Sequence, residues 1–463
     1  MDRRTSIVLK YLFSLLPLIG AISVKAQYEG TGVDYNSSSN KQAFAVFTNP
    51  GEDCSTSMNI SWATIPSTWS IIELTDETTG KTFIYDYDPE LFGRKEGPGA
   101  NINWSPSYFP EIYRCETFNN IPTYYKGGKR TTQNLIFNKY GLTLFDLIPD
   151  HEYSYHIISV NDHTQQQEIS DDYTFHTAGA SSWKAAVIGD FHYFSPLEKR
   201  IKSAMEMLDV VDSVSGGFDW VLSTGDTAAY GGSFNSWTEL SEEFFFRNYM
   251  WASVEGNHDY DAANKIKSDN YFRDSHYFPY NGYEGQEGIS YWFRYGDVLF
   301  LMLNNEAMRQ SGGFGPAIEW MESVVRENPS KYVVVVEHYQ WLSGTDGGNF
   351  MLDRFYGTFD RIGVDLAIAG NNHVYLRTPP LKGRQPVSPE EGTYYVVTPS
   401  SDNERGREMK RLVGNANIIE KRWTEGTHTV GAMLMDVNPQ RIEMILYDRY
   451  GQIRDSFTVP AKR

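Results

Sequence analysis

The residues best suited to chemistry stand together in the sequence Gly256-Asn257-His258-Asp259. Asn257 offers a neutral carbonyl oxygen that can bind a hard or borderline cation. His258 can gain or lose a proton near neutral pH, and Asp259 is suited to orienting its ring or raising its pKa. Gly256 permits a sharp backbone turn just before these side chains. The tetrapeptide alone also fits an ordinary polar turn, so its meaning depends on similar residues elsewhere.

Four further segments place Asp, Asn or His directly after an apolar run that we expect to be a strand. The residues concerned are Asp190 and His192, Asp226, His338, and Asn371 and His373. An Asp-x-His spacing at the end of a strand lets both side chains reach one ion as the chain turns. A single histidine at a strand end is usually structural, but five such strand ends are hard to explain by packing. The pattern predicts a metal site assembled from several loops.

The elements that position these residues follow an α/β pattern. Residues 183–188 and 218–224 are apolar runs that each lead into Gly-Asp, and residues 198–214 between them have helical spacing. The apolar positions of that helix are Ile201, Met205, Leu208 and Val211. Strand, helix and strand make the unit of a parallel sheet. Since ligand-bearing loops gather at the carboxyl ends of such strands, we expect Asp226 near Asp190.

The rest of the second half continues this alternation. The predicted elements are strands at residues 298–303, 332–338, 364–369 and 393–398, a helix at 316–326, and a hairpin at 429–436 and 441–447. Residues 260–291 form a long insertion, expected at the rim of the site, and residues 400–411 form a polar flap.

The first half has short alternating runs without helical patterns, which indicates an antiparallel β-sandwich over residues 27–178. The strands are expected at residues 58–62, 70–74, 134–144, 153–158 and 173–177. The spacing Leu147-x-Pro149-x-x-x-Tyr153 resembles the corner of fibronectin type III domains, where a tyrosine hydroxyl ties a loop to the next strand. The three histidines of this region, His151, His156 and His163, are interpreted as structural or exposed. A small-residue linker at 178–182 ends the sandwich.

The amino terminus is typical of an exported protein. Basic residues precede an apolar stretch at residues 11–24, and Val24-Lys25-Ala26 suits a signal peptidase. Residues 1–26 are therefore expected to be a signal peptide and the protein to be secreted or periplasmic, without a membrane anchor. The alternative for this segment is an anchor. Cys54 and Cys115 could pair in an oxidising compartment, which the sequence leaves open.

The formal net charge of −18 argues against extended nucleic acid as a partner, because phosphate backbones are bound by basic surfaces. A small phosphorylated substrate is compatible with this charge, since metal ions supply positive charge locally. The oligomeric state is not indicated by the sequence.

Together, the five motifs resemble the calcineurin-like metallophosphoesterases over residues 183–463. With a fibronectin-like sandwich in front, the arrangement is similar to that of the purple acid phosphatases. The resemblance implies an α/β two-sheet sandwich, with layers in the order αββα, behind the all-β sandwich.

The resemblance also implies a centre of two metal ions, with Fe, Zn or Mn expected. One ion would be held by Asp190, His192, Asp226 and His373, and the other by Asp226, Asn257, His338 and Asn371. A hydroxide bridging the ions would attack the phosphate. His258 would stabilise the developing charge and protonate the leaving oxygen, assisted by Asp259.

Two positions depart from the purple acid phosphatase pattern. His192 stands where those enzymes have glycine, and Tyr230 lies four residues after Asp226, where their tyrosine ligand lies three residues after. We therefore expect no purple charge-transfer colour. Asn371 stands where a histidine is expected. A weaker second site, able to take Mg or Ca, follows from this change.

The sequence thus predicts an exported metal-dependent phosphoesterase, a hydrolase acting on phosphate esters. It does not separate monoester, diester and nucleotide substrates. The alternative is a degenerate, non-catalytic phosphoesterase-like binding protein with one structural metal.

Overall fold

The structure is a computed structural model of the chain. It describes residues 43–64, 68–87, 111–118, 130–161, 163–179, 182–193, 198–229, 231, 234–260, 271–306, 308, 313–342, 350–402, 405–408 and 418–462. Residues 33–463 form one compact unit. The predicted signal peptide lies outside the described residues, as do parts of the linker, of the insertion and of the flap.

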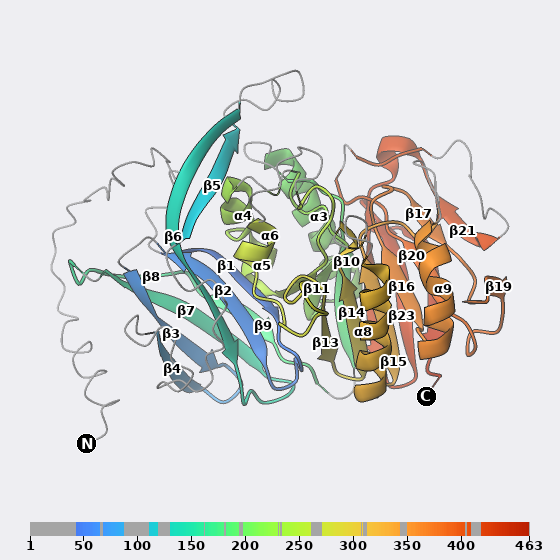
Figure 1. Ribbon diagram of the computed structural model, residues 1–463, viewed down its shortest axis with the longest axis horizontal. Coiled ribbons are helices and arrows are strands. Elements are labelled where there is room, and N and C mark those ends of the chain that lie inside the picture. Colours follow the sequence, from blue (N-terminus) through green and yellow to red (C-terminus); the bar gives the residue numbers. More distant parts are fainter. Residues whose placement is uncertain are drawn as a thin grey trace. The chain divides into compact units, whose positions relative to one another are not determined.

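Two antiparallel sheets make up the first half of this unit (Figure 1). One contains, in order, β1 (Ala43–Pro50), β2 (Met58–Thr64), β6 (Arg130–Leu144) and β5 (Glu111–Phe118). The other contains β4 (Lys81–Tyr87), β3 (Thr68–Asp76), β7 (Glu152–Asn161) and β8 (Gln167–Ile169), and β9 (Tyr173–His176) also pairs with β7. The all-β architecture predicted for this region is confirmed.

The tyrosine corner forms as its spacing indicates. The hydroxyl of Tyr153 at the start of β7 accepts the backbone N–H of Ile148 at 2.9 Å. This bond ties the loop before β7 to the strand. Membership of the fibronectin type III family remains a prediction.

A buried carboxylate, Asp76, joins two loops of the sandwich. It accepts the N–H groups of Thr78 and Thr79 at 3.0 and 3.1 Å, and its other oxygen lies 3.0 Å from His151 Nδ1. Burial alone would raise the pKa of Asp76, but the bonds from Thr79 and His151 outweigh it and lower this pKa. The carboxylate therefore stabilises the folded state above about pH 4, and that contribution is lost as the pH falls further.

Replacing Asp76 with Ala is expected to lower the free energy of unfolding by about 1–3 kcal/mol at pH 7, because buried N–H donors lose their acceptor. Denaturant unfolding followed by tryptophan fluorescence measures the change, and the difference from wild type should shrink at pH 3. Asp172→Ala is the control, since Asp172 pairs with His156 at an exposed position. If the free energies of unfolding of Asp76→Ala and wild type differed equally at pH 7 and pH 3, the stabilising role of the Asp76 carboxylate would be contradicted.

The second half contains two larger sheets. The first runs β12 (Met250–Ser253), β11 (Trp220–Ser223), β10 (Trp183–Ile188), β22 (Gly431–Asn438), β23 (Arg441–Asp448) and β24 (Ile453–Pro460). The second runs β13 (Tyr291–Tyr295), β14 (Val298–Leu303), β15 (Tyr332–Glu337), β16 (Leu366–Ala369), β20 (Tyr394–Val397), β17 (Tyr375–Arg377) and β21 (Lys421–Trp423). Strands β10, β11 and β12 are parallel, as are β14, β15, β16 and β20.

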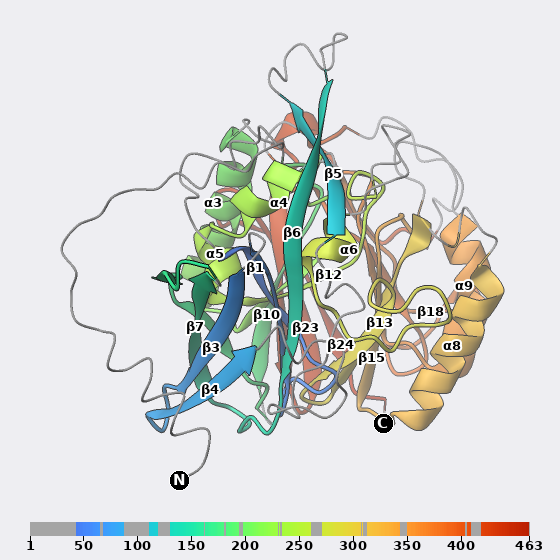
Figure 2. The same ribbon diagram turned by 60° about the vertical axis from the view of Figure 1, so that its left-hand side comes forward.

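Helices cover the outer faces of these sheets. Helix α3 (Glu198–Ser215) packs on β10 and β22, and its predicted apolar face is buried. Helices α8 (Phe314–Glu327) and α9 (Phe350–Ile362) contact one another, and Figure 1 and Figure 2 both show them side by side. The shorter elements are α4 (Phe234–Leu240), α5 (Phe244–Asn248), α6 (Tyr271–Ser275), η4 (Gly426–His428), β18 (Leu381–Lys382) and β19 (Gln385–Pro386).

Strand β14 shows how the layers separate. Val298, Phe300 and Met302 belong to the core shared with the first sheet, whereas the alternate residues 299, 301 and 303 pack with α8 and α9. Successive side chains of a strand point to opposite faces, so one apolar run supplies both cores. This confirms the predicted αββα order.

The β-sandwich and the α/β layers share one apolar core. Asn49 Nδ2 on β1 donates to the Trp251 carbonyl on β12 at 3.1 Å, and Cys54 N donates to the Arg294 carbonyl at 2.9 Å. The Cys54 thiol is buried. The side chain of Cys115 lies outside the described residues, so a disulfide between the two stays untested.

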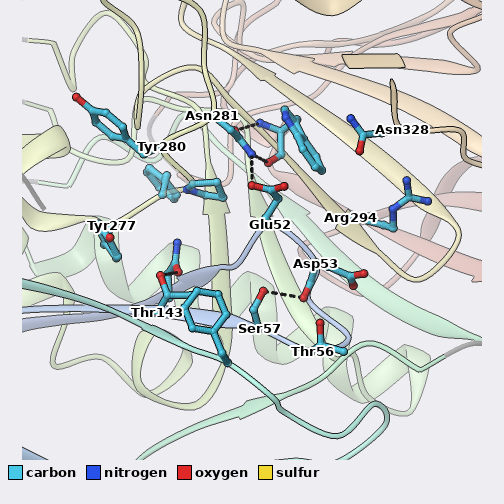
Figure 3. A pocket seen from close by; sticks show the side chains of 15 residues that line it. Glu52, Asp53, Thr56, Ser57, Thr143, Tyr277, Tyr280, Asn281, Arg294 and Asn328 are labelled. Carbon is cyan, nitrogen blue, oxygen red and sulfur yellow. Dashed lines mark hydrogen bonds between the residues drawn. The ribbon is translucent and has the colours of Figure 1, made fainter. Parts of the chain in front are cut away.

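A cleft of about 900 Å³ opens at this junction (Figure 3). Its lining includes Glu52 and Asp53 from the sandwich and Asn281, Trp292 and Arg294 from the α/β layers. Asn281 Nδ2 already donates to Glu52 at 3.4 Å and to the Trp292 carbonyl at 3.0 Å. The lining includes none of the candidate metal ligands. Among the described helices, none has the length and apolar character needed to cross a membrane.

Candidate metal centre

The predicted ligands follow the carboxyl ends of five parallel strands. Asp190 and His192 follow β10, Asp226 follows β11, Asn257 and His258 follow β12, His338 follows β15, and Asn371 and His373 follow β16. Because both sheets run their parallel strands toward the same edge, residues distant in sequence meet there. The structure brings these predicted residues together.

Asp226 is at the centre of the cluster. Its Oδ2 atom lies 3.0 Å from His192 Nε2 and 3.3 Å from His338 Nε2. Its Oδ1 atom accepts the backbone N–H of His258 at 2.8 Å. One carboxylate thus contacts loops after three different strands, which is the arrangement expected of a bridging ligand.

Three overlapping groups of side chains have ligand atoms within 4.8 Å of one another. They are Asp190, His192 and His373; His192, Asp226 and His258; and Asp190, Asp226 and His338. The closest approach of Asp190 to His373 is 3.4 Å, between Oδ1 and Nε2. Asp190, His192 and Asp226 each belong to two of the groups, so the cluster can hold two neighbouring ions that share ligands.

The four histidines are held in one tautomer by the backbone. Each ring contacts a carbonyl oxygen through Nδ1: His192 contacts Asp190 (2.8 Å), His258 Ala229 (2.9 Å), His338 Thr224 (2.8 Å) and His373 Arg405 (2.8 Å). Because a carbonyl can only accept, Nδ1 carries the hydrogen and Nε2 of the neutral ring keeps its lone pair. That is how proteins orient metal-binding imidazoles, so these residues fit a metal ion.

The backbone at the ligands is strained. Asp190, His192, Asp226, Asn371 and His373 all have positive φ angles, between 49° and 68°. Non-glycine residues adopt this region at a cost that is commonly retained at functional sites. The strain therefore supports a functional role for these loops.

Gly256 serves close packing. A Cβ atom on it would lie 2.2 Å from Asp226 Oδ1 and 2.4 Å from Asp226 N. Only glycine lets the loop after β12 approach the shared carboxylate.

The buried charges favour a cation. Burial raises the pKa of Asp190 to about 7. Burial would also raise the pKa of Asp226, but His338, His258 and His192 lower it well below its usual value. Burial opposes the charge on His338, yet Asp226 raises the pKa of that histidine to about 10. Neighbouring histidines thus stabilise the charge of Asp226, whereas burial disfavours the charge of Asp190, and metal ions would supply positive charge to both.

The second predicted ligand set is partly assembled. Asn257 Oδ1 lies 3.1 Å from His338 Nε2, beside Asp226. Asn371 donates its backbone N–H to Asp190 at 3.0 Å, and its side-chain Nδ2 donates to Gln340 at 2.5 Å. Asn371 therefore lies in the cluster with its amide engaged by a neighbour.

Asp259 occupies a different place from the one expected. Its carboxylate accepts the N–H groups of Ala228 at 2.8 Å and Gly256 at 3.0 Å. The ring contact of His258 is with Ala229, so the expectation that Asp259 assists that ring is corrected. Asp259 instead joins the loops after β11 and β12.

Sequence reasoning missed Asn305, which follows β14. Its Oδ1 accepts the N–H groups of both His338 and Tyr339 at 3.1 Å, and its Nδ2 donates to Glu337. The signal was present, because Asn304 and Asn305 follow an apolar strand as the ligands do. Asn305 fixes the backbone that carries His338.

Replacing Asn305 with Ala is expected to weaken metal binding at the second site about 10–100-fold, as loss of a supporting hydrogen bond typically does. The first site should keep its ion, because Asn305 contacts none of its ligands among its described bonds. Calorimetric titration of the metal-stripped protein resolves the two events. Asn248→Ala, at the half-buried carboxyl end of α5, is the control, because its side chain bonds only to Thr174 and Phe244 among the described residues. Loss of both ions, or of neither, would contradict this role.

Tyr230 lies outside the described residues, so the absence of a purple colour remains a prediction. His151 fits its structural interpretation through the bond to Asp76, and the side chains of His156 and His163 lie outside the cluster.

Comparison with known proteins agrees with this geometry. Residues 184–375 match the family described as Calcineurin-like phosphoesterase. The chain therefore contains a calcineurin-like phosphoesterase domain. Among curated proteins, no match to this sequence is found.

Two solved structures share the fold at low sequence identity. The purple acid phosphatase PPD1 from yellow lupin (Lupinus luteus) seeds has a TM-score of 0.65 and 13% identity, covering 90% of this chain and 74% of that one. A structure of PhoD has a TM-score of 0.54 and 10% identity, covering 92% and 93%. At these identities the likeness shows the metallophosphoesterase fold alone.

Proposed function

We propose that this protein is an exported metal-dependent phosphoesterase that hydrolyses phosphate esters. The observation that carries the proposal is the convergence of three Nε2 atoms, from His192, His338 and His373, on two buried carboxylates. Export is supported by the signal-like pattern of residues 1–26 and is tested by whether the secreted protein begins at Gln27.

The residues divide into two ligand sets that share Asp226. The first set is Asp190, His192, Asp226 and His373, and the second is Asp226, Asn257, His338 and Asn371. Ions bound there would polarise the phosphoryl group and lower the pKa of bound water. Mixed imidazole and carboxylate donors suit Zn, Fe or Mn, and the amide-rich second set also admits Mg or Ca.

His258 is placed to act on the substrate. Unlike the buried His192 and His338, it is partly exposed, and its ring centroid lies 4.6 Å from that of His192. The Ala229 carbonyl holds Nδ1, which leaves Nε2 as the nitrogen that exchanges a proton. In its charged form Nε2–H can stabilise charge on the phosphoryl oxygens and protonate the leaving oxygen.

The test is turnover of chromogenic phosphate monoesters and diesters by metal-stripped protein, given Mn, Zn, Fe, Mg or Ca in turn. Turnover restored by at least one metal is the expected result. The metal that restores turnover identifies the ion that the weaker site prefers.

A second candidate function is metal-dependent binding without catalysis. Asn371 favours it, because its amide is already bonded to Gln340 and is a weaker donor than the imidazole expected there. Folded protein that binds one ion tightly but turns over no ester with any metal would establish this alternative.

A further inference from the structure

The cleft at the junction of the β-sandwich and the α/β layers takes no part in the proposed chemistry. Its volume of about 900 Å³ lies within the range of about 300–1,000 Å³ that is usual for small-molecule sites, which occur preferentially at domain junctions. None of its lining residues belongs to the groups of candidate metal ligands found among the described residues. The ligand of this cleft must therefore be inferred from its own lining.

Two polar side chains of the lining are held from behind by backbone carbonyls (Figure 3). Arg294 Nη1 donates to the Pro329 carbonyl at 3.1 Å, and Asn328 Nδ2 donates to the Val324 carbonyl at 3.0 Å. Because a carbonyl can only accept, these bonds fix which atoms of each side chain are used. The other guanidinium nitrogens of Arg294 and the Oδ1 atom of Asn328 have no partner among the described residues.

A third polar group, the carboxylate of Glu52, is held in the same way. Glu52 is exposed, and its Oε2 atom accepts Asn281 Nδ2 at 3.4 Å. The Asn281 amide is itself fixed, because it donates to the Trp292 carbonyl at 3.0 Å and accepts the Trp292 N–H at 2.9 Å. In the part of the chain that the structure describes, Glu52 Oε1 has no partner. The cleft thus offers preorganised donors and acceptors to a ligand.

The outer edge of β13, which runs along the cleft, is closed to a further strand. The backbone N–H and C=O of Trp292 are both bonded to the Asn281 side chain. Those of Arg294 are bonded to the Glu52 carbonyl and the Cys54 N–H, each at 2.9 Å. A peptide that extends a sheet needs unpaired backbone groups at its edge, and these two residues have none. The lining therefore argues against an extended peptide.

Aromatic side chains supply the apolar part of the lining. Tyr280 at the rim is 55% exposed, and a Cβ atom on Gly288 would lie 3.4 Å from its Cδ2 atom, so the ring packs against that glycine. The half-buried Trp292 belongs to the same lining. The face of an aromatic ring carries negative charge and attracts the C–H bonds that line one face of a sugar ring. Exposed aromatic rings beside fixed polar groups therefore suit a carbohydrate.

The charged groups of the lining favour a neutral ligand. They are Glu52, Asp53 and Arg294. The two carboxylates repel an anion, and the guanidinium repels a cation. Hydroxyl groups match the mixture of donors and acceptors, because each hydroxyl both donates and accepts. A neutral molecule with many hydroxyl groups and an apolar C–H face is a carbohydrate.

We propose that this cleft is a binding site for neutral oligosaccharides. Tyr280 and Trp292 contact the C–H faces of sugar rings. Glu52, Arg294 and Asn328 form hydrogen bonds with sugar hydroxyl groups. The site is separate from the metal centre, so it attaches the protein to a glycan whether or not the centre hydrolyses esters.

The test is binding of the full-length protein to an array of neutral, sulfated and sialylated oligosaccharides, followed by calorimetric titration with the neutral oligosaccharide that binds most strongly. Tyr280→Ala and Glu52→Gln should each weaken this binding about 10-fold, the loss expected for an aromatic contact or a hydrogen bond to a charged group. Tyr450→Ala is the matched control, because Tyr450 is 72% exposed and lies outside the lining. It should leave the affinity unchanged, as should removal of metal ions.

Near-ultraviolet circular dichroism checks the folding of each variant, and both changed residues are exposed. Absence of binding to every neutral oligosaccharide would overturn the inference, as would binding confined to sulfated or sialylated ones. Unchanged affinity in both Tyr280→Ala and Glu52→Gln would place the sugar elsewhere and overturn it too. If wild type binds the oligosaccharide but turns over no ester with any metal, the proposed function fails and this inference stands.

Discussion

Replacing Asp226 with Asn is expected to reduce turnover by about 10³-fold or more and to weaken binding at both metal sites. Asparagine keeps an oxygen for the N–H of His258 but loses the negative charge that faces His192 and His338. Removing a single preorganised electrostatic group typically costs about 10²–10³-fold, and this carboxylate serves two ions at once. The measurements are kcat with saturating metal and metal content by atomic absorption.

The matched control is Asp297→Asn, an exposed carboxylate at the turn between β13 and β14. It should leave turnover and metal content unchanged. An Asp226→Asn protein that retains two ions and turns over within 10-fold of wild type would show that the carboxylate is no bridging ligand.

The ligand positions were predictable because each follows an apolar strand directly. Strand polarity then decides where the ligands meet, since parallel strands deliver their carboxyl ends to one edge. For this reason the pairing of Asp190 with His373, 183 residues apart, needs no information beyond strand order. The same logic explains why the αββα layers could be expected from the alternation of strands and helices.

Other parts of the site carry no such signal. Arg405 meets His373 through a loop contact 32 residues along the chain, and this contact is made by its backbone carbonyl, a group that every residue type has. The predicted role of Asp259 was wrong for a related reason. Adjacency to His258 suggested a ring partner, but the turn after β12 directs its carboxylate to backbone N–H groups of the loop after β11. Side-chain direction in irregular loops is set by tertiary contacts.

The elements missed by sequence reasoning show the same limit. Helix α9 buries Met351, Leu352, Phe355 and Phe359 against the second sheet. The sequence offered a starting signal, because Asn349 directly before it is a residue type preferred at helix N-caps, but this helix was not predicted. Strand β24 was missed because its exposed and buried residues alternate only weakly in polarity. The strand is specified instead by its antiparallel pairing with β23.

Replacing His258 with Ala is expected to lower turnover by about 10²-fold or more, with the metal content unchanged. The ring is held through Nδ1 by the Ala229 carbonyl and is partly exposed, which suits a proton donor to substrate. The loss should depend on the leaving group. An alkoxide needs its proton in the transition state, whereas p-nitrophenolate leaves without one.

The decisive measurement is therefore the ratio of kcat/KM for an alkyl phosphate to that for p-nitrophenyl phosphate, in wild type and variant. His258→Ala should lower the ratio by about 10-fold or more, within the range of general acid catalysis. His428→Ala, exposed at the end of η4, is the control and should leave it unchanged. An equal loss on both substrates would assign His258 to charge stabilisation alone, and a loss of bound metal would make it a ligand. Proton donation by His258 thus makes a prediction that neither other role shares.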